Sequence, residues 1–195
     1  MSEPGRQLVW PPGGADDPGG SHRHQWKDHH HISAERGAGG GLPEFKHEKF
    51  NIAPILEKSL KQFYVTCDVR EIEIVNEIND FEFVGDENWT GEAIENIIKN
   101  CIEHTNNNGK LRFFSQMTNV YNSLFIQDNG CGITKEDLPH IFERFYHGKN
   151  SSSESVGIGL ALAKTVLEKE KGDIIVNSEL GKGSIFELRF YKTIV

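Results

Sequence analysis

Apolar residues recur at helical spacing in three stretches of the chain, residues 54–63, 87–105 and 157–171. In each stretch an apolar side chain returns every three to four positions, which places these side chains on one face of a helix. Thr134, with Asp137 three positions later, has the capping pattern of a further short helix. The apolar stripe of the longest stretch consists of Ala93, Ile94, Ile97, Ile98 and Cys101.

Shorter stretches are rich in β-branched and aromatic residues, which favours strands. Residues 69–75 and 81–84 are expected to form a hairpin or an adjacent pair, and residues 110–116 and 121–127 an antiparallel hairpin. Strands come in pairs rather than in strict alternation with helices, which predicts an α+β fold. We expect a two-layer α/β sandwich, with three helices on one face of a mostly antiparallel mixed sheet of five to six strands. The last strands expected are residues 173–176 and 184–190.

Residues 1–43 show neither periodicity. Their first 42 positions contain nine glycines and five of the nine histidines of the chain. So little apolar surface cannot offset the entropy of ordering the segment, which predicts a flexible leader or linker, of artificial or natural origin. A metal-binding histidine tract is the alternative. Residues 44–195 are expected to form the globular domain.

Charge and composition narrow the class of protein. The net charge is −8, which argues against nucleic acid as a partner because phosphate binding needs a basic surface. The three cysteines form no metal or redox spacing, so a reducing cytoplasm is expected. No apolar run approaches the ~20 residues of a membrane span. If the parent protein is anchored in a membrane, the anchor is expected outside this chain.

A carboxylate followed by two glycines marks the first candidate for chemistry. Asp128 ends a predicted strand, and Gly130 and Gly132 let the backbone turn sharply and approach a flat ligand. A carboxylate there can accept a hydrogen bond from an exocyclic amine, which favours adenine over guanine. A capping or salt-bridged aspartate is the alternative interpretation.

Two further groups suit a nucleotide. Asn96 and Asn100 lie four positions apart and share a helical face, where amide oxygens can ligate Mg²⁺. Gly157 and Gly159 precede a helix whose free backbone N–H groups favour phosphate. Lys149 can approach a triphosphate from the polar, serine-rich segment between these groups. Solvated amides, ordinary turn glycines and an exposed lysine are the alternatives.

Five motifs in order resemble the catalytic ATP-binding domain of sensor histidine kinases, in the superfamily shared with gyrase, Hsp90 and MutL. The resemblance covers roughly residues 46–192. The motifs, named as in that family, are the N box (Asn96 to Asn100), the G1 box (Asp128 to Gly132), the F box (Ile141 to Tyr146), the G2 box (Gly157 to Leu160) and the G3 turn (Gly181 to Ser184).

The resemblance implies roles for individual residues. Asn100 would ligate Mg²⁺ beside Asn96, and Asp128 would bind the adenine amino group with support from Ser184 through water. Arg144 would stabilise the γ-phosphate or dock on the phosphoacceptor domain, so Asn96 and Arg144 are the catalytic candidates. The expected ATP-binding residues are Asn96, Asn100, His104, Asp128, Gly130, Gly132, Ile133, Phe142, Tyr146, Lys149, Gly157, Ile158, Gly159, Leu160 and Ser184.

The segment of about residues 146–157 would be the ATP lid, with Phe142 and Phe145 anchoring it and gripping the partner helix. Two positions depart from the family pattern. His104 stands where an aromatic residue often packs on the base. Glu103 stands where a lysine is frequent, which removes one phosphate contact.

Residue 96 separates classes within the superfamily. The hydrolysing relatives place a glutamate there as general base, whereas asparagine cannot take a proton at neutral pH. The chain is therefore expected to transfer phosphate to a nucleophile supplied elsewhere. None of its nine histidines lies in a His-Glu-x-x-Thr-Pro-like context, so the phosphoacceptor histidine and the dimerising hairpin are expected on another domain.

The expected function is a protein histidine kinase that binds Mg-ATP and acts on the phosphoacceptor domain of its own kinase, with a response regulator downstream. The isolated domain is expected to be a cytoplasmic monomer, and the full-length kinase a homodimer anchored in the cell membrane. Two alternatives remain: a serine/threonine kinase of the anti-sigma-factor type, and a non-catalytic nucleotide-binding module.

Overall fold

The computed structural model describes residues 45–146, 148 and 157–192. The predicted leader, residues 1–43, lies outside this part. Among the described residues, no helix combines the length and apolar character needed to span a bilayer. The elements in chain order are β1 (Glu48–Asn51), α1 (Ile52–Lys61), α2 (Tyr64–Val69), β2 (Glu73–Glu77), β3 (Glu82–Gly85), α3 (Glu87–His104), β4 (Lys110–Met117), β5 (Tyr121–Asp128), α4 (Gly159–Lys169), β6 (Gly172–Glu179) and β7 (Gly183–Tyr191).

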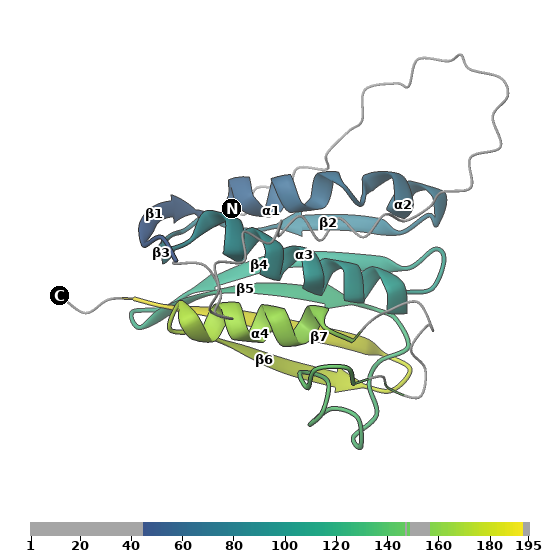
Figure 1. Cartoon of the computed structure of the whole chain (residues 1–195). Coiled ribbons are helices and arrows are strands. Elements are labelled where there is room, and N and C mark those ends of the chain that lie inside the picture. Colours follow the sequence, from purple (N-terminus) through teal and green to yellow (C-terminus); the bar gives the residue numbers. More distant parts are fainter. Residues whose placement is uncertain (1–44, 147, 149–156, 193–195) are drawn as a thin grey trace, which may run out of the picture. The chain divides into compact units, whose positions relative to one another are not determined.

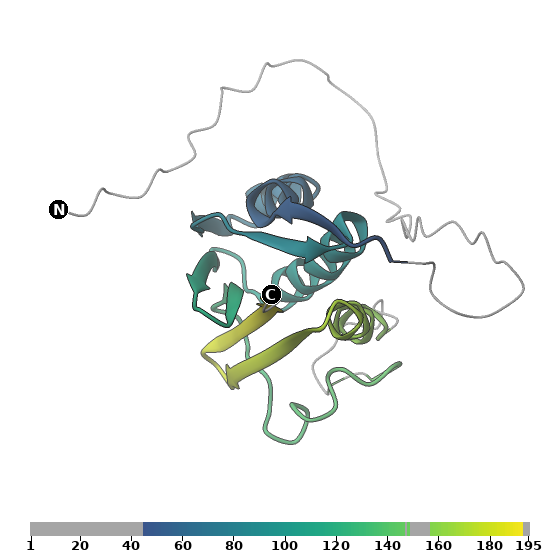
Figure 2. The ribbon, with the colours of Figure 1, turned by 90° about the vertical axis from the view of Figure 1, so that its left-hand side faces the viewer.

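Five strands form one mixed sheet in the order β2-β4-β5-β7-β6. β2 runs parallel to β4, and all other neighbours are antiparallel. α1, α3 and α4 lie on one face of this sheet (Figure 1), and the view along the helices in Figure 2 shows them and the sheet as two layers. The predicted two-layer sandwich with a mostly antiparallel mixed sheet is confirmed, as is the hairpin formed by β4 and β5.

The predicted pairing of residues 69–75 with residues 81–84 is wrong. β2 pairs with β4, whereas β3 pairs with β1 in a separate two-stranded sheet. Val69 is the last residue of α2 rather than the start of a strand, and the chain turns through Glu71 at φ 54°. Alternating side chains show that a segment is a strand but carry no information about which strand lies beside it.

The long helix α3 begins and packs as its sequence predicts. The Asp86 side chain caps it by accepting hydrogen bonds from the backbone N–H groups of Asn88 and Trp89 (3.0 and 3.2 Å). All five residues of the predicted apolar stripe are fully buried. The buried stripe therefore fixes α3 in the core of the domain. The polar residues of α3 lie on another side of the helix.

The short helix predicted after Thr134 is absent, and a turn takes its place. Thr134 Oγ1 does accept a hydrogen bond from the Asp137 N–H (3.1 Å), and the Leu138 N–H bonds to the Thr134 carbonyl (3.0 Å). Pro139 follows directly and has no N–H to continue the ladder, so the first turn is not extended.

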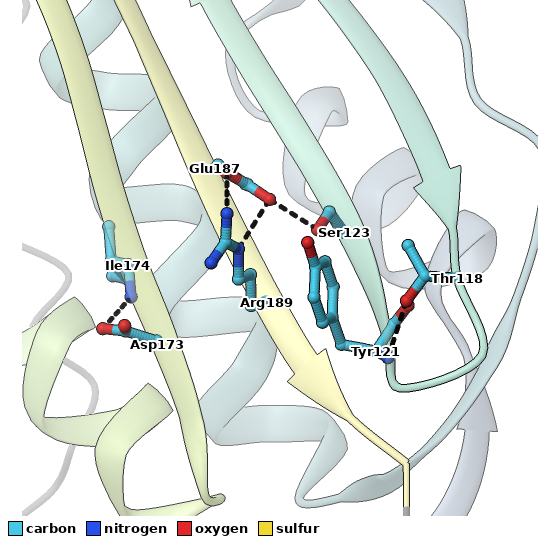
Figure 3. Close-up of polar contacts among 7 residues, drawn as sticks. All are labelled: Thr118, Tyr121, Ser123, Asp173, Ile174, Glu187 and Arg189. Carbon is cyan, nitrogen blue, oxygen red and sulfur yellow. Dashed lines mark hydrogen bonds and ion pairs between the residues drawn. The ribbon is translucent and has the colours of Figure 1, made fainter.

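The face of the sheet away from the helices carries paired charges (Figure 3). Glu187 on β7 accepts hydrogen bonds from Arg189 Nε and Nη2 (2.7 and 2.9 Å) and from the Ser123 hydroxyl of β5 (2.8 Å). The Arg189 guanidinium also lies 4.8 Å from the centroid of the Tyr121 ring. Hydrogen-bonded polar groups thus occupy positions that alternate with the core-facing residues of β7.

A half-buried carboxylate joins the start of α3 to the end of α4. Glu170 accepts hydrogen bonds from the Asp86 backbone N–H (2.8 Å) and from the Thr90 hydroxyl (2.9 and 3.0 Å to its two oxygens). Burial raises the pKa of Glu170 to about 7, the hydrogen bonds from Asp86 and Thr90 oppose this rise, and the nearby Asp86 charge adds to it. Ionised Glu170 therefore costs the folded state free energy.

Replacing Glu170 by Gln is expected to remove a pH dependence of stability. Between pH 4.5 and about 7 the unfolded chain has released a proton that the folded chain retains, so stability falls as pH rises through this window. By pH 8 the loss is nearly complete and amounts to about 3 kcal/mol. Urea unfolding from pH 4 to pH 8 should show Glu170→Gln equal to the wild type at pH 4 and more stable at pH 8.

The matched control is Glu168→Gln, which changes an exposed glutamate two positions earlier on α4. This variant should keep the wild-type pH dependence. An unchanged slope in Glu170→Gln would contradict the assignment of the buried proton to Glu170.

Candidate functional site

Asp128 ends β5 and is held in one orientation by donors from several elements. Its Oδ1 accepts hydrogen bonds from the backbone N–H groups of Gly130 (2.9 Å) and of Ser184 on β7 (3.3 Å). The Cys101 thiol of α3 lies close enough to this carboxylate to affect its pKa. Burial raises the pKa of Asp128, and the hydrogen bonds from Gly130 and Ser184, together with the nearby Cys101 thiol, partly offset this effect. The carboxylate is thus a fixed, desolvated hydrogen-bond acceptor.

The G1 box lies in direct contact with the last turn of α3. The Cys131 N–H donates to the His104 carbonyl (3.1 Å), and a Cβ added at Gly130 would lie 2.1 Å from the same oxygen. Gly132 has φ 69°, and a Cβ there would lie 2.1 Å from the Glu179 carbonyl oxygen. Both glycines are therefore required by close approach to neighbouring backbone carbonyls, whereas the predicted approach to a flat ligand stays a prediction.

The other side of the G1 box is bonded to the β6–β7 hairpin. The Ile133 N–H donates to Ser178 Oγ (2.8 Å), and the Gly181 N–H donates to the Cys131 carbonyl (2.7 Å). The Ser184 hydroxyl lies 3.0 Å from Ser178 Oγ, so Ser184 contacts Asp128 with its backbone N–H and Ser178 with its side chain. Ser178 of β6 and Ser184 of the G3 turn thus connect the β6–β7 hairpin to Ile133 and Asp128.

Asn96, Asn100 and His104 follow one another at four-residue intervals along one line of α3. Asn96 Nδ2 donates to the Glu92 carbonyl (2.8 Å), and its Oδ1 would lie 2.6 Å from a Cβ added at Gly159. The amide oxygen of Asn96 therefore faces the first residue of α4. At the other end of the line, His104 Nδ1 lies 3.8 Å from the Cys131 thiol.

The F box lies beside α4 and carries exposed side chains. Phe142 is half-buried, and the Lys164 ammonium of α4 lies 5.3 Å from the centroid of its ring. Arg144 is exposed, and Phe145 is 67% exposed. An exposed arginine and an exposed phenylalanine next to each other suit contact with another molecule.

The end of the F box and the G2 box are joined. The Phe145 N–H donates to the Gly157 carbonyl (2.8 Å), and Gly157, at φ 68°, approaches the Tyr146 carbonyl so closely that a Cβ would lie 2.8 Å from it. The Tyr146 hydroxyl donates to Asp137 Oδ1 (2.7 Å). The two ends of the predicted lid therefore lie together, whereas Lys149 and residues 147 and 150–156 lie outside the described residues.

The structure thus connects several of the predicted site residues with one another. Asp128 contacts the G1 box and Ser184, the G1 box contacts His104, and the line of α3 that carries His104 and Asn100 reaches Gly159 through Asn96. Phe142 lies outside this connected set, beside α4.

Oxygen atoms of amides are the candidate metal ligands. Among residues 45–146, 148 and 157–192, no group of three or more His, Cys, Asp and Glu side chains is placed to hold a metal ion. Asn96 and Asn100 present neutral amide oxygens instead, which suit a hard cation that takes its remaining ligands from water and phosphate. This donor set fits Mg²⁺ bound together with a phosphate ligand, rather than a cation held by protein alone.

Sequence reasoning missed two side chains of the site, Cys101 and Ser178. Cys101 appears in the sequence only as part of the apolar stripe of α3. Ser178 pairs directly with Ser184 across the β6–β7 hairpin. Centring that hairpin on the glycines of the G3 turn would have placed the two serines opposite each other, so Ser178 had a usable signal, whereas Cys101 had none.

Comparison with known proteins gives the family. Residues 85–194 match the family described as "Histidine kinase-, DNA gyrase B-, and HSP90-like ATPase". The sensor histidine kinase YvrG of Bacillus subtilis is 32% identical over 124 residues, which are 63% of this chain and 21% of that protein. The heme sensor protein HssS of Staphylococcus saprophyticus is 28% identical over 138 residues, 71% of this chain and 30% of that protein. The chain thus spans less than a third of the length of these relatives.

Solved structures agree on the fold. The catalytic domain of the histidine kinase ThkA is 22% identical with a TM-score of 0.68, covering 77% of this chain and 99% of that one. The mycobacterial sensor histidine kinase MprB is 24% identical with a TM-score of 0.65, covering 74% and 97%. The chain belongs to the family of histidine kinase-, DNA gyrase B- and HSP90-like ATPases, and it is similar to the catalytic part of sensor histidine kinases.

Proposed function

We propose that this domain binds Mg-ATP and donates the γ-phosphoryl group to a histidine on a partner dimerisation and phosphoacceptor domain. The observation that carries the proposal is the contact between the G1 box and the last turn of α3. It sets the buried carboxylate of Asp128 beside the helix line that carries Asn100 and Asn96. A carboxylate that could accept from a base and two amides that could ligate a metal thereby lie on neighbouring elements, which supports the proposal.

The adenine would be read by Asp128. A desolvated carboxylate fixed by the Gly130 and Ser184 N–H groups can accept a hydrogen bond from the exocyclic amine of adenine. A site built to make such a bond rejects ligands that cannot supply the donor. Gly130, Gly132 and Ile133 would line the base with backbone, because side chains at the two glycines would collide with neighbouring carbonyls.

The phosphates would lie between α3 and the start of α4. Asn100, with Asn96 beside it, would hold Mg²⁺, which neutralises phosphate charge and fixes the in-line geometry of transfer. The N–H groups at the start of α4, from Gly157 to Leu160, would contact the phosphates. Asn96 cannot act as a general base, which supports transfer to a partner nucleophile rather than hydrolysis.

The exposed part of the F box would meet the partner. Arg144 would stabilise the γ-phosphate or dock on the phosphoacceptor domain, and the exposed Phe145 would grip the partner helix together with Phe142. Tyr146 and Lys149 would contact the nucleotide from the lid, about residues 146–157. Residues 44–195 would be the catalytic domain, and residues 1–43 a leader.

The wider assembly is proposed by analogy. ThkA has been solved in complex with the response regulator TrrA, at a TM-score of 0.64 and 21% identity to this chain, and full-length ShkA in complex with AMPPNP, at 0.68 and 20%. For this chain we propose a response regulator downstream, a homodimeric parent kinase anchored in the membrane, and a cytoplasmic position for the monomeric domain.

The test is phosphoryl transfer to the cognate phosphoacceptor domain. Mixed with that domain, Mg²⁺ and ATP labelled at the γ-phosphate, the chain should place label on the acceptor histidine, and no label should appear without Mg²⁺. The product should lose its label in acid, because phosphohistidine is acid-labile whereas phosphoserine is stable. Acid-stable label would favour the serine/threonine kinase alternative. Unlabelled acceptor, with ATP binding intact, would remove the kinase assignment and leave a nucleotide-binding module.

A further inference from the structure

Arg70 lies between α2 and β2, outside the matched family region, and its guanidinium is fully engaged with the end of α3. Nη1 donates to the Ile102 carbonyl (2.6 Å), Nη2 donates to the Thr105 carbonyl, and Nε donates to the Asn107 side chain (3.2 Å). The Arg70 carbonyl in turn accepts from the Asn108 N–H (2.9 Å). One residue thus bonds to four residues of the last turn of α3 and the loop after it.

This arrangement answers a general need of helix ends. The last four carbonyls of a helix have no partner within the helix, and a cation there also interacts favourably with the helix dipole. Arg70 satisfies two such carbonyls at once because its planar guanidinium presents several donors in a fixed geometry, which a lysine ammonium cannot reproduce. The end of α3 is thereby held from the side of α2.

The same turn is held from its other side by the G1 box. The His104 carbonyl, between the two carbonyls that Arg70 binds, accepts the Cys131 N–H and abuts Gly130. The Asn129 side chain accepts the Lys110 N–H (2.7 Å) at the start of β4, just after the α3–β4 loop. The position of the G1 box therefore depends on the position of the α3 terminus.

We propose that Arg70 is a positioning residue for the nucleotide base. It fixes the His104 carbonyl, against which Gly130 and Cys131 pack, and so fixes the G1 box that orients Asp128. Arg70 touches no part of the site itself. The inference rests on the proposed function for its ligand, but the mechanical link from Arg70 to the G1 box can be measured without nucleotide.

The experiment compares Arg70→Met and Arg70→Lys in the full chain. Met keeps the length of the side chain and removes all its donors, whereas Lys keeps the charge with a single donor group. The matched control is Arg112→Met on β4, where the arginine pairs with Glu77 (2.6 Å) and stacks on Phe114, on the helix-free face of the sheet. Each variant is first checked for cooperative unfolding in urea.

Two measurements follow. In the nucleotide-free protein, the amide of Cys131 should exchange its hydrogen about tenfold faster in Arg70→Met than in the wild type, because local opening of the α3 terminus becomes easier.

The affinity of Arg70→Met for ATP should fall about tenfold. Its KM for ATP should rise with kcat unchanged, because binding of the base is lost equally in the ground and transition states. Affinity for inorganic tripolyphosphate with Mg²⁺, which has no base, should stay unchanged. In both its Cys131 exchange rate and its affinity for ATP, Arg70→Lys should lie between Arg70→Met and the wild type. Arg112→Met should match the wild type in both.

An unchanged exchange rate at Cys131 in folded Arg70→Met would overturn the proposal, as would equal losses of affinity for ATP and for tripolyphosphate. If Arg70→Met does not fold, the Cys131 exchange rate of Arg70→Lys decides. A wild-type chain that fails to bind ATP would instead remove the proposed function, and the exchange result would then still report whether Arg70 positions the G1 box.

Discussion

Replacing Asp128 by Asn is expected to weaken ATP binding by about 100-fold or more, since a hydrogen bond to a buried charged group contributes about 1.5 to 3 kcal/mol and a mismatched pair adds to the loss. Asparagine keeps one oxygen for the Gly130 and Ser184 N–H groups, so the fold should survive. Its amide NH₂ replaces the second oxygen and turns an acceptor into a donor. In the Asp128→Asn variant, the side-chain NH₂ group would then face the NH₂ group of adenine, and neither group could accept a hydrogen bond from the other. Calorimetric titration with a non-hydrolysable ATP analogue measures the loss.

The control for this substitution is Asp173→Asn. Asp173 is also a strand aspartate that accepts a backbone N–H, that of Ile174 (2.8 Å), but it lies near Arg189 and Glu187 in the group shown in Figure 3, away from the site. Its affinity for ATP should equal that of the wild type. Equal affinity in Asp128→Asn would discredit the adenine role.

Binding of ATP by the wild type should also weaken as pH falls through the raised pKa of Asp128, because only the carboxylate accepts freely with both oxygens.

Replacing Gly130 by Ala is expected to abolish measurable ATP binding and to destabilise the domain by about 2 kcal/mol or more, the range of strained or overpacked sites. The added methyl group would lie 2.1 Å from the His104 carbonyl oxygen, and a backbone atom cannot move aside by rotating a side chain. Either the G1 box or the α3 terminus must shift, and the Cys131–His104 hydrogen bond would be lost with it. Urea unfolding and ATP titration measure the two effects.

Gly91→Ala provides the contrast within the same domain. Gly91 lies in α3, and a Cβ there would be 3.7 Å from its nearest neighbour, Ile55, which is an ordinary contact. Alanine is favoured over glycine inside a helix by about 1 kcal/mol, so this variant should be more stable than the wild type and bind ATP normally. If both glycine variants behaved alike, the close approach of Gly130 to α3 would not be the cause.

The sequence predicts most strongly where one physical signal dominates. The apolar stripe of α3 and the Asp86 cap agree with each other, and the helix forms where both predict it. β1 escaped prediction because Phe50 is its one half-buried position and its other residues are exposed. The parallel pairing of β2 with β4 was missed because it depends on how α3 crosses between them, which local alternation does not encode.

The residues of the candidate site likewise fall into those that local sequence predicts and those that it does not. Asp128 and the glycines around it could be found from the sequence, because a carboxylate at a strand end and glycines at close backbone approaches are local requirements. The Cys101 contact with Asp128 and the hold of Arg70 on α3 depend on which face of a packed helix meets which distant loop. Such contacts between segments far apart in the chain leave no periodic trace in either segment.

The meeting of Asn96 with Gly159 has a consequence for the exchange of parts among relatives. Because the amide of one helix occupies the space that a side chain on the other would need, the distance between α3 and α4 is matched to this pair of residues. A chimaera that takes one helix from this protein and the other from a homologue with a bulkier residue at either position would assemble with the helices spread apart. The two helices are therefore best transplanted as a single cassette.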